Sequence, residues 1–307
     1  MFSRLREVLK IIYKRLFVLY LVVFFLIYFI VDWKKMTAHA KATTLSRLMP
    51  TYDYLVAYIE GQEPFDRVKL EEYEYYYERL LDSLQWPDIQ GMMGFCHYHL
   101  GHEKLAIKAY KRAIQINPNY FAFHYNLGLI YFKKGLYEEA IKNVLAALET
   151  DWEYNLHFIH QSKTYLPILK RTGKLESEVV QRLQKGYYSC YTILVLSYYY
   201  LKKYPQMFYV CRDALEHIDG EEKKRLFYFY SALASYQLKE YKKSIFFLQE
   251  YISFIPDDPD AFNYMGLSFR ALGMEPLAQK ALTQAALFKD REDPKALVEH
   301  GLTLHIF

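Results

Sequence analysis

The sequence predicts an all-α protein, with one N-terminal membrane helix followed by stacked pairs of helices and a final capping helix. Three observations predict this fold class. Only 12 Gly and 10 Pro occur in 307 residues, which leaves few turn signals for a many-stranded fold. Residues 16–31 form an uncharged apolar run. From Gly94 onward, small residues recur at an offset of 34 residues, which indicates a repeated supersecondary unit.

The composition excludes several classes of protein. A hydrophobic content of 52% excludes intrinsic disorder. The net charge of +4 is concentrated in residues 1–35, where seven Lys and Arg face two acidic residues, so the rest of the chain lacks the basic surface that a nucleic-acid-binding protein needs. Cys96, Cys190 and Cys211 have no Cys-x-x-Cys spacing, and we expect them to be small core residues.

The run at residues 16–31 predicts a transmembrane anchor over residues 16–35, preceded by a basic cytoplasmic tail at residues 1–15. Sixteen helical residues reach about 24 Å, which is less than the bilayer core of about 30 Å. Flanking residues with snorkelling or interfacial side chains are therefore needed to complete the span. These flanking residues are Lys14, Arg15, Trp33, Lys34 and Lys35.

The alternative for this segment is a cleaved signal peptide, because Ala38-His39-Ala40 resembles a cleavage site. The length of the apolar run and the position of Trp33-Lys34-Lys35 inside the cleavage region favour an anchor instead. Five positive residues precede the run and four follow it closely, which predicts a cytoplasmic N-terminus. We therefore expect a single-pass protein of a bacterial inner membrane, with the bulk of the chain in the periplasm.

An offset of 34 residues links the first two of three windows to each other, and it links the third window to the residues that precede it. The first contains Gly94, Gly101, Ala106, Tyr110, Ala113 and Pro118, and the second contains Gly128, Gly135, Ala140, Val144 and Ala147. The third contains Gly266, Gly273, Ala278, Leu282 and Ala285, and Ala232, Ser244, Leu248, Tyr251 and Pro256 precede it by one period.

These residues resemble the tetratricopeptide repeat (TPR) family, and the stretch MGFCHYHLGHEKLAIKAYKRAIQINP matches its pattern best. The resemblance implies antiparallel helix pairs that stack into a right-handed α-solenoid. It divides the chain into a helical connector or divergent repeat at 36–86, two clear units at 87–154, a degenerate helical pair at 155–187, three further units at 188–292 and a capping helix at 293–307.

In this family the first helix of each pair lines the concave surface where partners bind. Carrying those positions over predicts an aromatic, largely uncharged groove for a protein partner. Its members are Phe95, Tyr98, Tyr125, Leu129, Phe132, Tyr199, Tyr200, Phe229 and Tyr236. The alternative is that these side chains are covered by the protein itself.

No signature of catalysis or of metal binding stands out. The chain has no phosphate-binding glycine loop, no His-Glu-x-x-His and no Gly-x-Ser-x-Gly. His99 and His102 have a helical i, i+3 spacing, but Gly101 ends the helix between them. The sequence therefore predicts no enzyme activity, no catalytic residue, no metal and no cofactor.

The leading functional hypothesis is a membrane-anchored adaptor that binds another protein, itself membrane-associated, and supports assembly of an envelope complex. One alternative is a self-assembling subunit of a ring or collar, such as a flagellar-motor or secretion accessory structure, which requires a homo-oligomer. Another is an accessory subunit of a membrane enzyme. No nucleic-acid partner is expected.

Overall fold

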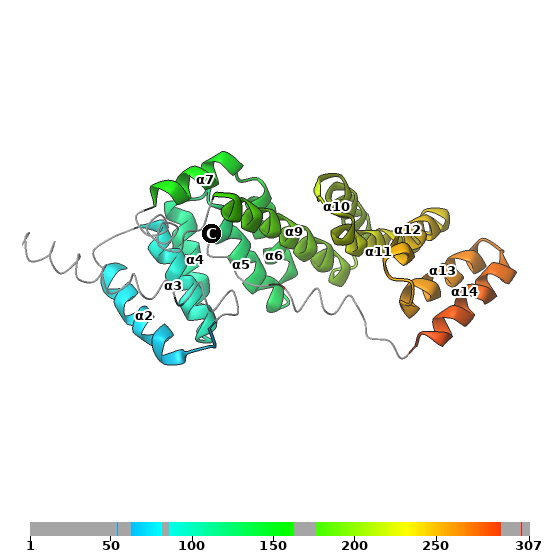
Figure 1. The fold of residues 1–307 in the computed structure, drawn as a ribbon, viewed down its shortest axis with the longest axis horizontal. Coiled ribbons are helices and arrows are strands. Elements are labelled where there is room, and N and C mark those ends of the chain that lie inside the picture. Colours follow the sequence, from blue (N-terminus) through cyan, green and yellow to red (C-terminus); the bar gives the residue numbers. More distant parts are fainter. Residues whose placement is uncertain (1–53, 55–62, 82–85, 163–175, 290–301, 303–307) are drawn as a thin grey trace, which may run out of the picture. The chain divides into compact units, whose positions relative to one another are not determined.

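The computed structural model describes residues 54, 63–81, 86–162, 176–289 and 302. In these residues the chain forms twelve α-helices and no strand (Figure 1). The prediction of an all-α fold is therefore confirmed. The chain divides into two compact units, Met1–Leu84 and Gln85–Phe307, which are described separately below.

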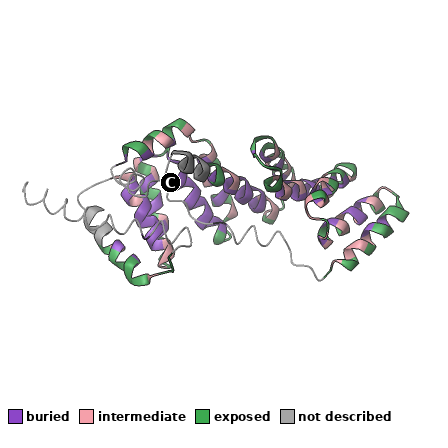
Figure 2. Cartoon of the chain, viewed as in Figure 1, coloured by how far each residue is buried: buried purple, intermediate pink, exposed green. Residues whose placement is uncertain are grey.

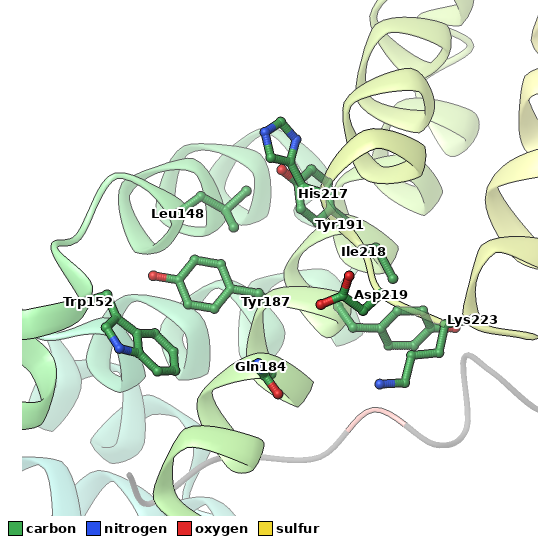
Figure 3. Close-up of a pocket in the computed structure, with 10 residues that line it drawn as sticks. Leu148, Trp152, Gln184, Tyr187, Tyr191, His217, Ile218, Asp219 and Lys223 are labelled. Atoms are coloured by element: carbon green, nitrogen blue, oxygen red, sulfur yellow. The ribbon is translucent and has the colours of Figure 1, made fainter. Parts of the chain in front are cut away.

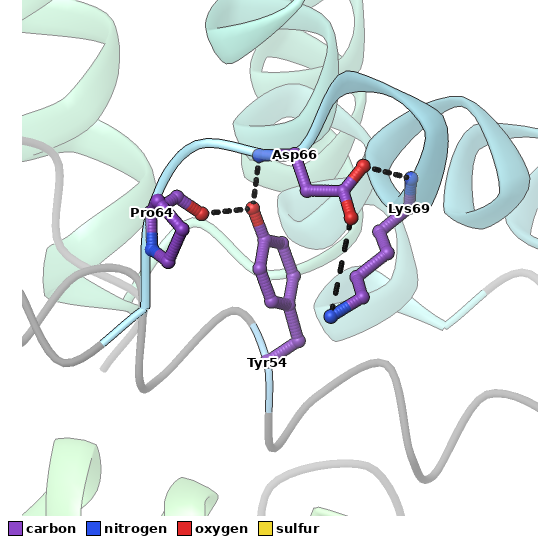
Figure 4. Close-up of polar contacts among 4 residues, drawn as sticks. All are labelled: Tyr54, Pro64, Asp66 and Lys69. Atoms are coloured by element: carbon purple, nitrogen blue, oxygen red, sulfur yellow. Dashed lines mark hydrogen bonds and ion pairs between the residues drawn. The ribbon is translucent and has the colours of Figure 1, made fainter.

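The described part of the first unit centres on α2 (Arg67–Leu81). Asp66 caps this helix, because its carboxylate accepts a hydrogen bond from the backbone N–H of Lys69 at 3.1 Å. The buried Tyr54 hydroxyl donates to the carbonyl of Pro64 at 2.9 Å and accepts from the N–H of Asp66 (Figure 4). The Lys69 ammonium lies 4.5 Å from the centre of the Tyr54 ring. These contacts fix the start of α2.

Among the described residues, no helix combines the length and apolar character that crossing a membrane requires. The predicted anchor at 16–35, its flanking residues and the tail at 1–15 all lie outside those residues. The same holds for the predicted capping helix at 293–307, except for Leu302, which is only 3% exposed.

In its described residues, the second unit consists of helix pairs with one additional helix between the second and third pairs. The pairs are α3 (Pro87–His99) with α4 (Glu103–Ile116), α5 (Phe121–Lys133) with α6 (Tyr137–Leu148), α9 (Glu176–Tyr200) with α10 (Tyr204–His217), α11 (Glu221–Gln237) with α12 (Tyr241–Phe254), and α13 (Pro259–Ala271) with α14 (Glu275–Leu287). The additional helix is α7 (Trp152–Gln161). Paired helices pack against each other, and each pair contacts the next along the chain. Past α7, this contact is made by α5 and α6 against α9.

In every described pair, the turn between the two helices contains one residue with a left-handed backbone conformation. It occurs at the same repeat position each time, at Gly101, Gly135 and Gly273 with φ of +81°, +72° and +75°, and at Lys202 and Lys239 with φ of +56° and +61°. The following residue then donates its N–H to a carbonyl five residues back, as His102 does to His97 at 2.7 Å. This is the hydrogen-bond pattern of a Schellman motif, and it reverses the chain within three residues.

Glycines in the first helices bring paired helices close together. A Cβ atom at Gly128 would lie 2.6 Å from Cγ2 of Val144 and 3.3 Å from the carbonyl oxygen of Ala140, both in α6. The equivalent position in the last pair, Gly266, faces Leu282 in the same way. A side chain at either glycine would push the helices apart, which explains why the 34-residue period includes this small residue.

The core lies along the first helices of the pairs. Every residue of α5 from Phe121 to Phe132 is buried, because α4, α6 and α9 surround this helix (Figure 2). The largest fully buried side chains include Tyr110, Tyr125 and Tyr251. A large part of the aromatic excess therefore fills the interior of the unit.

The interval 155–187 contains most of α7 and the first half of α9, which runs without a break through position 188. Two buried hydrogen bonds hold α7. Oδ1 of Asn155 accepts from the N–H of Phe121 at 2.7 Å, and Oγ of Ser162 donates to Oδ2 of Asp88 at 2.6 Å. The second bond joins residues 74 positions apart and connects the end of α7 to the start of α3.

Candidate functional site

Five of the nine side chains predicted for the groove are buried. They are Phe95, Tyr125, Leu129, Phe132 and Phe229, each at most 4% exposed. The Tyr125 ring stacks on Phe121 with 5.8 Å between centroids, and Phe229 lies 5.2 Å from Tyr251. These five side chains are therefore covered by other residues of the chain, and a partner cannot contact them in this structure.

The other four members of the predicted groove are accessible. Tyr98, Tyr199 and Tyr236 are half-buried, and Tyr200 is 41% exposed. Further half-buried tyrosines from α6, α10, α12 and α13 adjoin them. We call the whole set the tyrosine edge, which consists of Tyr98, Tyr137, Tyr199, Tyr200, Tyr204, Tyr236, Tyr241 and Tyr264.

Most of the tyrosine edge lies beside the turns within the helix pairs, and neighbouring rings contact one another. Tyr137 and Tyr200 stack with 4.9 Å between centroids and an interplanar angle of 14°. Tyr236 lies 5.7 Å from Tyr241 and 5.4 Å from Tyr264. Rings from different helix pairs thus form continuous stretches of partly exposed aromatic surface.

The pKa of Tyr264 reports how closely the phenols are grouped. Burial is the largest cause of its raised pKa, and the nearby Tyr199, Asp260, Tyr236 and Tyr204 raise it further. Tyrosines of α9, α10 and α11 therefore lie within electrostatic range of α13. At neutral pH the Tyr264 hydroxyl is protonated and can donate a hydrogen bond.

Sequence reasoning missed Tyr264 of α13, and it also missed Tyr137, Tyr204 and Tyr241, although a signal for these last three exists. Each is the first residue of the second helix in its pair, at the same repeat position. The prediction considered only first helices, because those line the concave surface in the family. The recurrence of tyrosine at this position would have identified them.

Three cations beside the tyrosine edge form ion pairs. Lys134 pairs with Glu103, Lys203 pairs with Glu138 at 3.6 Å, and Arg270 pairs with Glu275 at 3.4 Å. These pairs leave a surface dominated by aromatic rings and hydroxyl groups.

His99 lies at the α3 end of this surface and is uncharged at neutral pH. Its pKa is lowered to about 4, mainly by burial and secondly by the positive charge of Lys133. The Lys133 ammonium lies 5.9 Å from the centre of the Tyr98 ring, which places a cation directly beside the edge.

The three cysteines are buried, as the sequence predicts. Burial raises the pKa of Cys190 and of Cys211, so both thiols stay protonated at neutral pH. A protonated, inaccessible thiol is a poor nucleophile and a poor metal ligand. The role of Cys190 and Cys211 is therefore in packing.

The chain also resembles known families and proteins. Residues 97–135 match the family described as TPR repeat, and residues 121–151 match the family described as tetratricopeptide repeat. The TPR repeat-containing protein YpiA of Bacillus subtilis (strain 168) is 27% identical over 240 residues, which are 73% of this chain and 53% of YpiA. The Hsp70-Hsp90 organising protein of Plasmodium falciparum (isolate 3D7) is 37% identical over 60 residues, which are 20% of this chain and 11% of that protein.

Among solved structures, the fold is similar to that of YrrB, described as a TPR protein with an unusual peptide-binding site. The TM-score is 0.51 at 12% identity, and the match covers 73% of this chain and 94% of YrrB. At this identity the likeness concerns the fold alone. The matched region spans about half the length of YpiA and about a tenth of the Plasmodium protein. With its paired helices and left-handed turns, this chain is an α-helical repeat protein whose residues 97–151 match tetratricopeptide repeats.

Proposed function

We propose that this chain is a membrane-anchored adaptor that binds a protein partner on the tyrosine edge. The single observation that carries the proposal is the presence of stretches of partly exposed aromatic rings near the turns of the helix pairs. Tyrosine is enriched at the energetic centres of protein interfaces, because it buries a large ring and keeps a hydroxyl for hydrogen bonding. Few rotatable bonds also limit the entropy lost on binding.

The three ion pairs beside the tyrosine edge support a protein partner with an apolar or aromatic contact surface. A strongly charged partner would need an excess of charge of opposite sign, whereas Lys134, Lys203 and Arg270 are each paired with an acid of the chain itself. The description of YrrB as a peptide-binding TPR protein is in keeping with a peptide or protein partner.

The apolar run at residues 16–31 supports the membrane part of the proposal. An anchor there holds the helical repeats at the surface of a bacterial inner membrane, on the periplasmic side. Confinement to the membrane raises the effective concentration toward membrane-bound partners, so a modest affinity at the tyrosine edge suffices. In this role the protein carries out no reaction and needs no cofactor, and it supports assembly of an envelope complex.

Photocrosslinking in the native membrane tests the binding site. A benzoylphenylalanine residue replaces Tyr199 or Tyr236 in the full-length chain, and Lys142, an exposed residue of α6 outside the edge, is the control position. We expect one partner to be crosslinked at the two edge positions and not at Lys142. Crosslinking of the chain to itself would favour the ring or collar alternative, and equal capture at all three positions would contradict the proposal.

The anchor is tested separately by alkaline extraction of membranes and by protease treatment of spheroplasts. We expect the full-length chain to stay in the membrane fraction at high pH and residues 86–289 to be digested from outside. Extraction into the soluble fraction, or full protection of residues 86–289, would contradict the proposed anchor or its orientation.

A further inference from the structure

A pocket of about 430 Å³ lies on the second unit, away from the residues of the tyrosine edge. It is bounded by the end of α6, the start of α7, the middle of α9 and the turn between α10 and α11 (Figure 3). Its volume falls within the range of small-ligand sites, about 300–1,000 Å³. Gln184 and Tyr187, which line it, belong to the part of α9 that precedes position 188, where the 34-residue pattern resumes.

Aromatic rings form much of the pocket wall. Trp152, Tyr187, Tyr188 and Tyr191 all line it, and the rings of Trp152 and Tyr187 lie 6.2 Å apart. Two of the hydroxyls are bound to the protein, since Tyr191 donates to Oδ2 of Asp213 at 2.7 Å and Tyr187 to the carbonyl of Thr150 at 3.5 Å. These contacts direct the hydroxyls toward the protein, so that the rings themselves are the groups available to a ligand.

Charged groups of both signs lie around these rings. Asp219 lines the pocket, and Asp213 lies behind Tyr191. His217, another lining residue, lies 3.2 Å from a carboxylate oxygen of Asp213, and its pKa is raised by the hydrogen bond to the Asp213 carbonyl and by the Asp213 charge. Glu216 belongs to the same group of side chains. Lys223 also lines the pocket and adds a positive charge. The nearby Arg225 pairs with Glu222 at 3.5 Å. The aromatic rings and the Asp219 carboxylate on the same wall together form a surface that can hold a flat cation.

We propose that this pocket binds the guanidinium group of an arginine side chain presented by a partner protein. A guanidinium is flat, delocalised and weakly hydrated, so it can lie against the rings of Trp152 and Tyr187. Its fork of N–H groups donates to the carboxylate of Asp219, which points into the same space (Figure 3). The assignment uses no residue of the tyrosine edge, so it holds or fails independently of the adaptor function.

Lys223 gives the proposal a test with a defined sign. Its exposed ammonium lies at the rim of the pocket and repels another cation. Replacing Lys223 by Ala should therefore strengthen the binding of an arginine and weaken the binding of an anion. Replacing Asp219 by Asn should have the opposite effects, while the similar shape of the side chain preserves packing.

The test uses the full-length chain in detergent, with Trp33 and Trp86 replaced by Phe so that Trp152 alone reports binding. The probes are the peptide Ala-Ala-Arg-Ala-Ala, the same peptide with citrulline, which is uncharged and has nearly the same shape, and the tetramethylammonium ion. We expect saturable quenching by the arginine peptide, at least tenfold weaker binding of the citrulline peptide, about tenfold weaker arginine binding by D219N and severalfold tighter binding by K223A.

Several results would overturn the assignment. They are equal binding of the arginine and citrulline peptides, weaker arginine binding by K223A, or no binding of any probe. Tighter binding of tetramethylammonium than of the arginine peptide would also overturn it, because the site would then select a quaternary ammonium. Asp219 and Lys223 are both exposed, so thermal unfolding should be unchanged in both variants and serves as the folding control.

Discussion

At the scale of single residues, the fold depends on five left-handed turn positions. Gly101, Gly135 and Gly273 adopt this conformation without strain, whereas Lys202 and Lys239 have a Cβ that crowds the backbone there. A non-glycine residue in this region costs about 1–2 kcal/mol. The two lysine turns keep the same hydrogen bonds as the glycine turns, with Lys203 donating to Tyr198 at 2.9 Å. The packing of the helix pairs therefore outweighs the local strain.

The two lysine turns predict a stabilising substitution. Replacing Lys202 or Lys239 by Gly should raise the free energy of unfolding by about 0.5–1 kcal/mol each, because relief of the strain exceeds the backbone entropy that glycine loses on folding. Urea unfolding of the full-length chain in detergent measures the change. Lys142→Gly, in the middle of α6, is the matched control and should cost about 1 kcal/mol. Equal destabilisation by all three substitutions would show that the turns are not strained.

His99 predicts a pH dependence of stability. Its pKa of about 4 in the folded chain is below the ordinary value of 6.5, mainly because of burial and secondly because of Lys133. Between these two values the unfolded chain binds a proton that the folded chain does not. Stability should therefore fall as the pH falls from about 6.5 to about 4, by up to roughly 1.4 kcal/mol per pH unit.

Comparing the wild-type chain with His99→Gln between pH 7 and pH 4 isolates this contribution. The variant should lose less stability on acidification, because Gln does not titrate. His124, whose pKa is also lowered by burial, remains in both proteins and accounts for part of the residual slope. Parallel pH profiles for the two proteins would contradict the assignment to His99.

At the scale of helices, the sequence predicts the pairs more readily than their connections. The 34-residue period carries the glycines and alanines that let paired helices approach, so positions such as Gly94 and Gly128 identify the pairs. The position of α7 is harder to predict from the sequence, because the contacts that hold it are long-range. The bond between Ser162 and Asp88 joins residues 74 positions apart, and no local pattern marks that partnership.

Asn155 is the residue whose loss should weaken the attachment of α7 most directly. It is 1% exposed, its Oδ1 accepts from the N–H of Phe121, and its Nδ2 donates to the carbonyl of Asp151 at 2.6 Å. Asn155→Ala leaves the N–H of Phe121 without this acceptor in the interior. We expect a loss of about 1–3 kcal/mol in the free energy of unfolding.

Urea unfolding and amide hydrogen exchange check this prediction, with faster exchange expected at the N–H of Phe121. The control is Asn143→Ala, because Asn143 makes a single exposed hydrogen bond to Glu139 within α6. That change should cost less than about 0.5 kcal/mol. A similar small cost for Asn155→Ala would mean that the contacts of Phe158 and Ile159 hold α7 without the amide.

At the scale of the whole molecule, the sequence predicts the fold class and the repeats but not which first-helix rings remain accessible. Tyr125 and Phe132 have the family's inward-facing positions, yet α5 is covered on all sides by α4, α6 and α9. The lengthening of α9 ahead of position 188 changes what lies against α5, and a period of 34 residues carries no information about that change. Tyr200, at the end of α9, stays 41% exposed.

This difference in burial separates packing residues from binding residues. Tyr125→Ala removes a fully buried ring that stacks on Phe121, so it should lower the free energy of unfolding by about 3–5 kcal/mol. Tyr200→Ala removes a ring that already contacts water, and we expect a loss of less than about 1 kcal/mol together with weaker capture of the partner by the tyrosine edge. Urea unfolding and quantitative photocrosslinking at Tyr236, performed on both variants, give the two readouts. In the reverse pattern, Tyr125→Ala would keep its stability and lose the partner, while Tyr200→Ala would keep the partner. That result would place the binding surface in the groove predicted from the sequence, and the first helices would then have to open before binding.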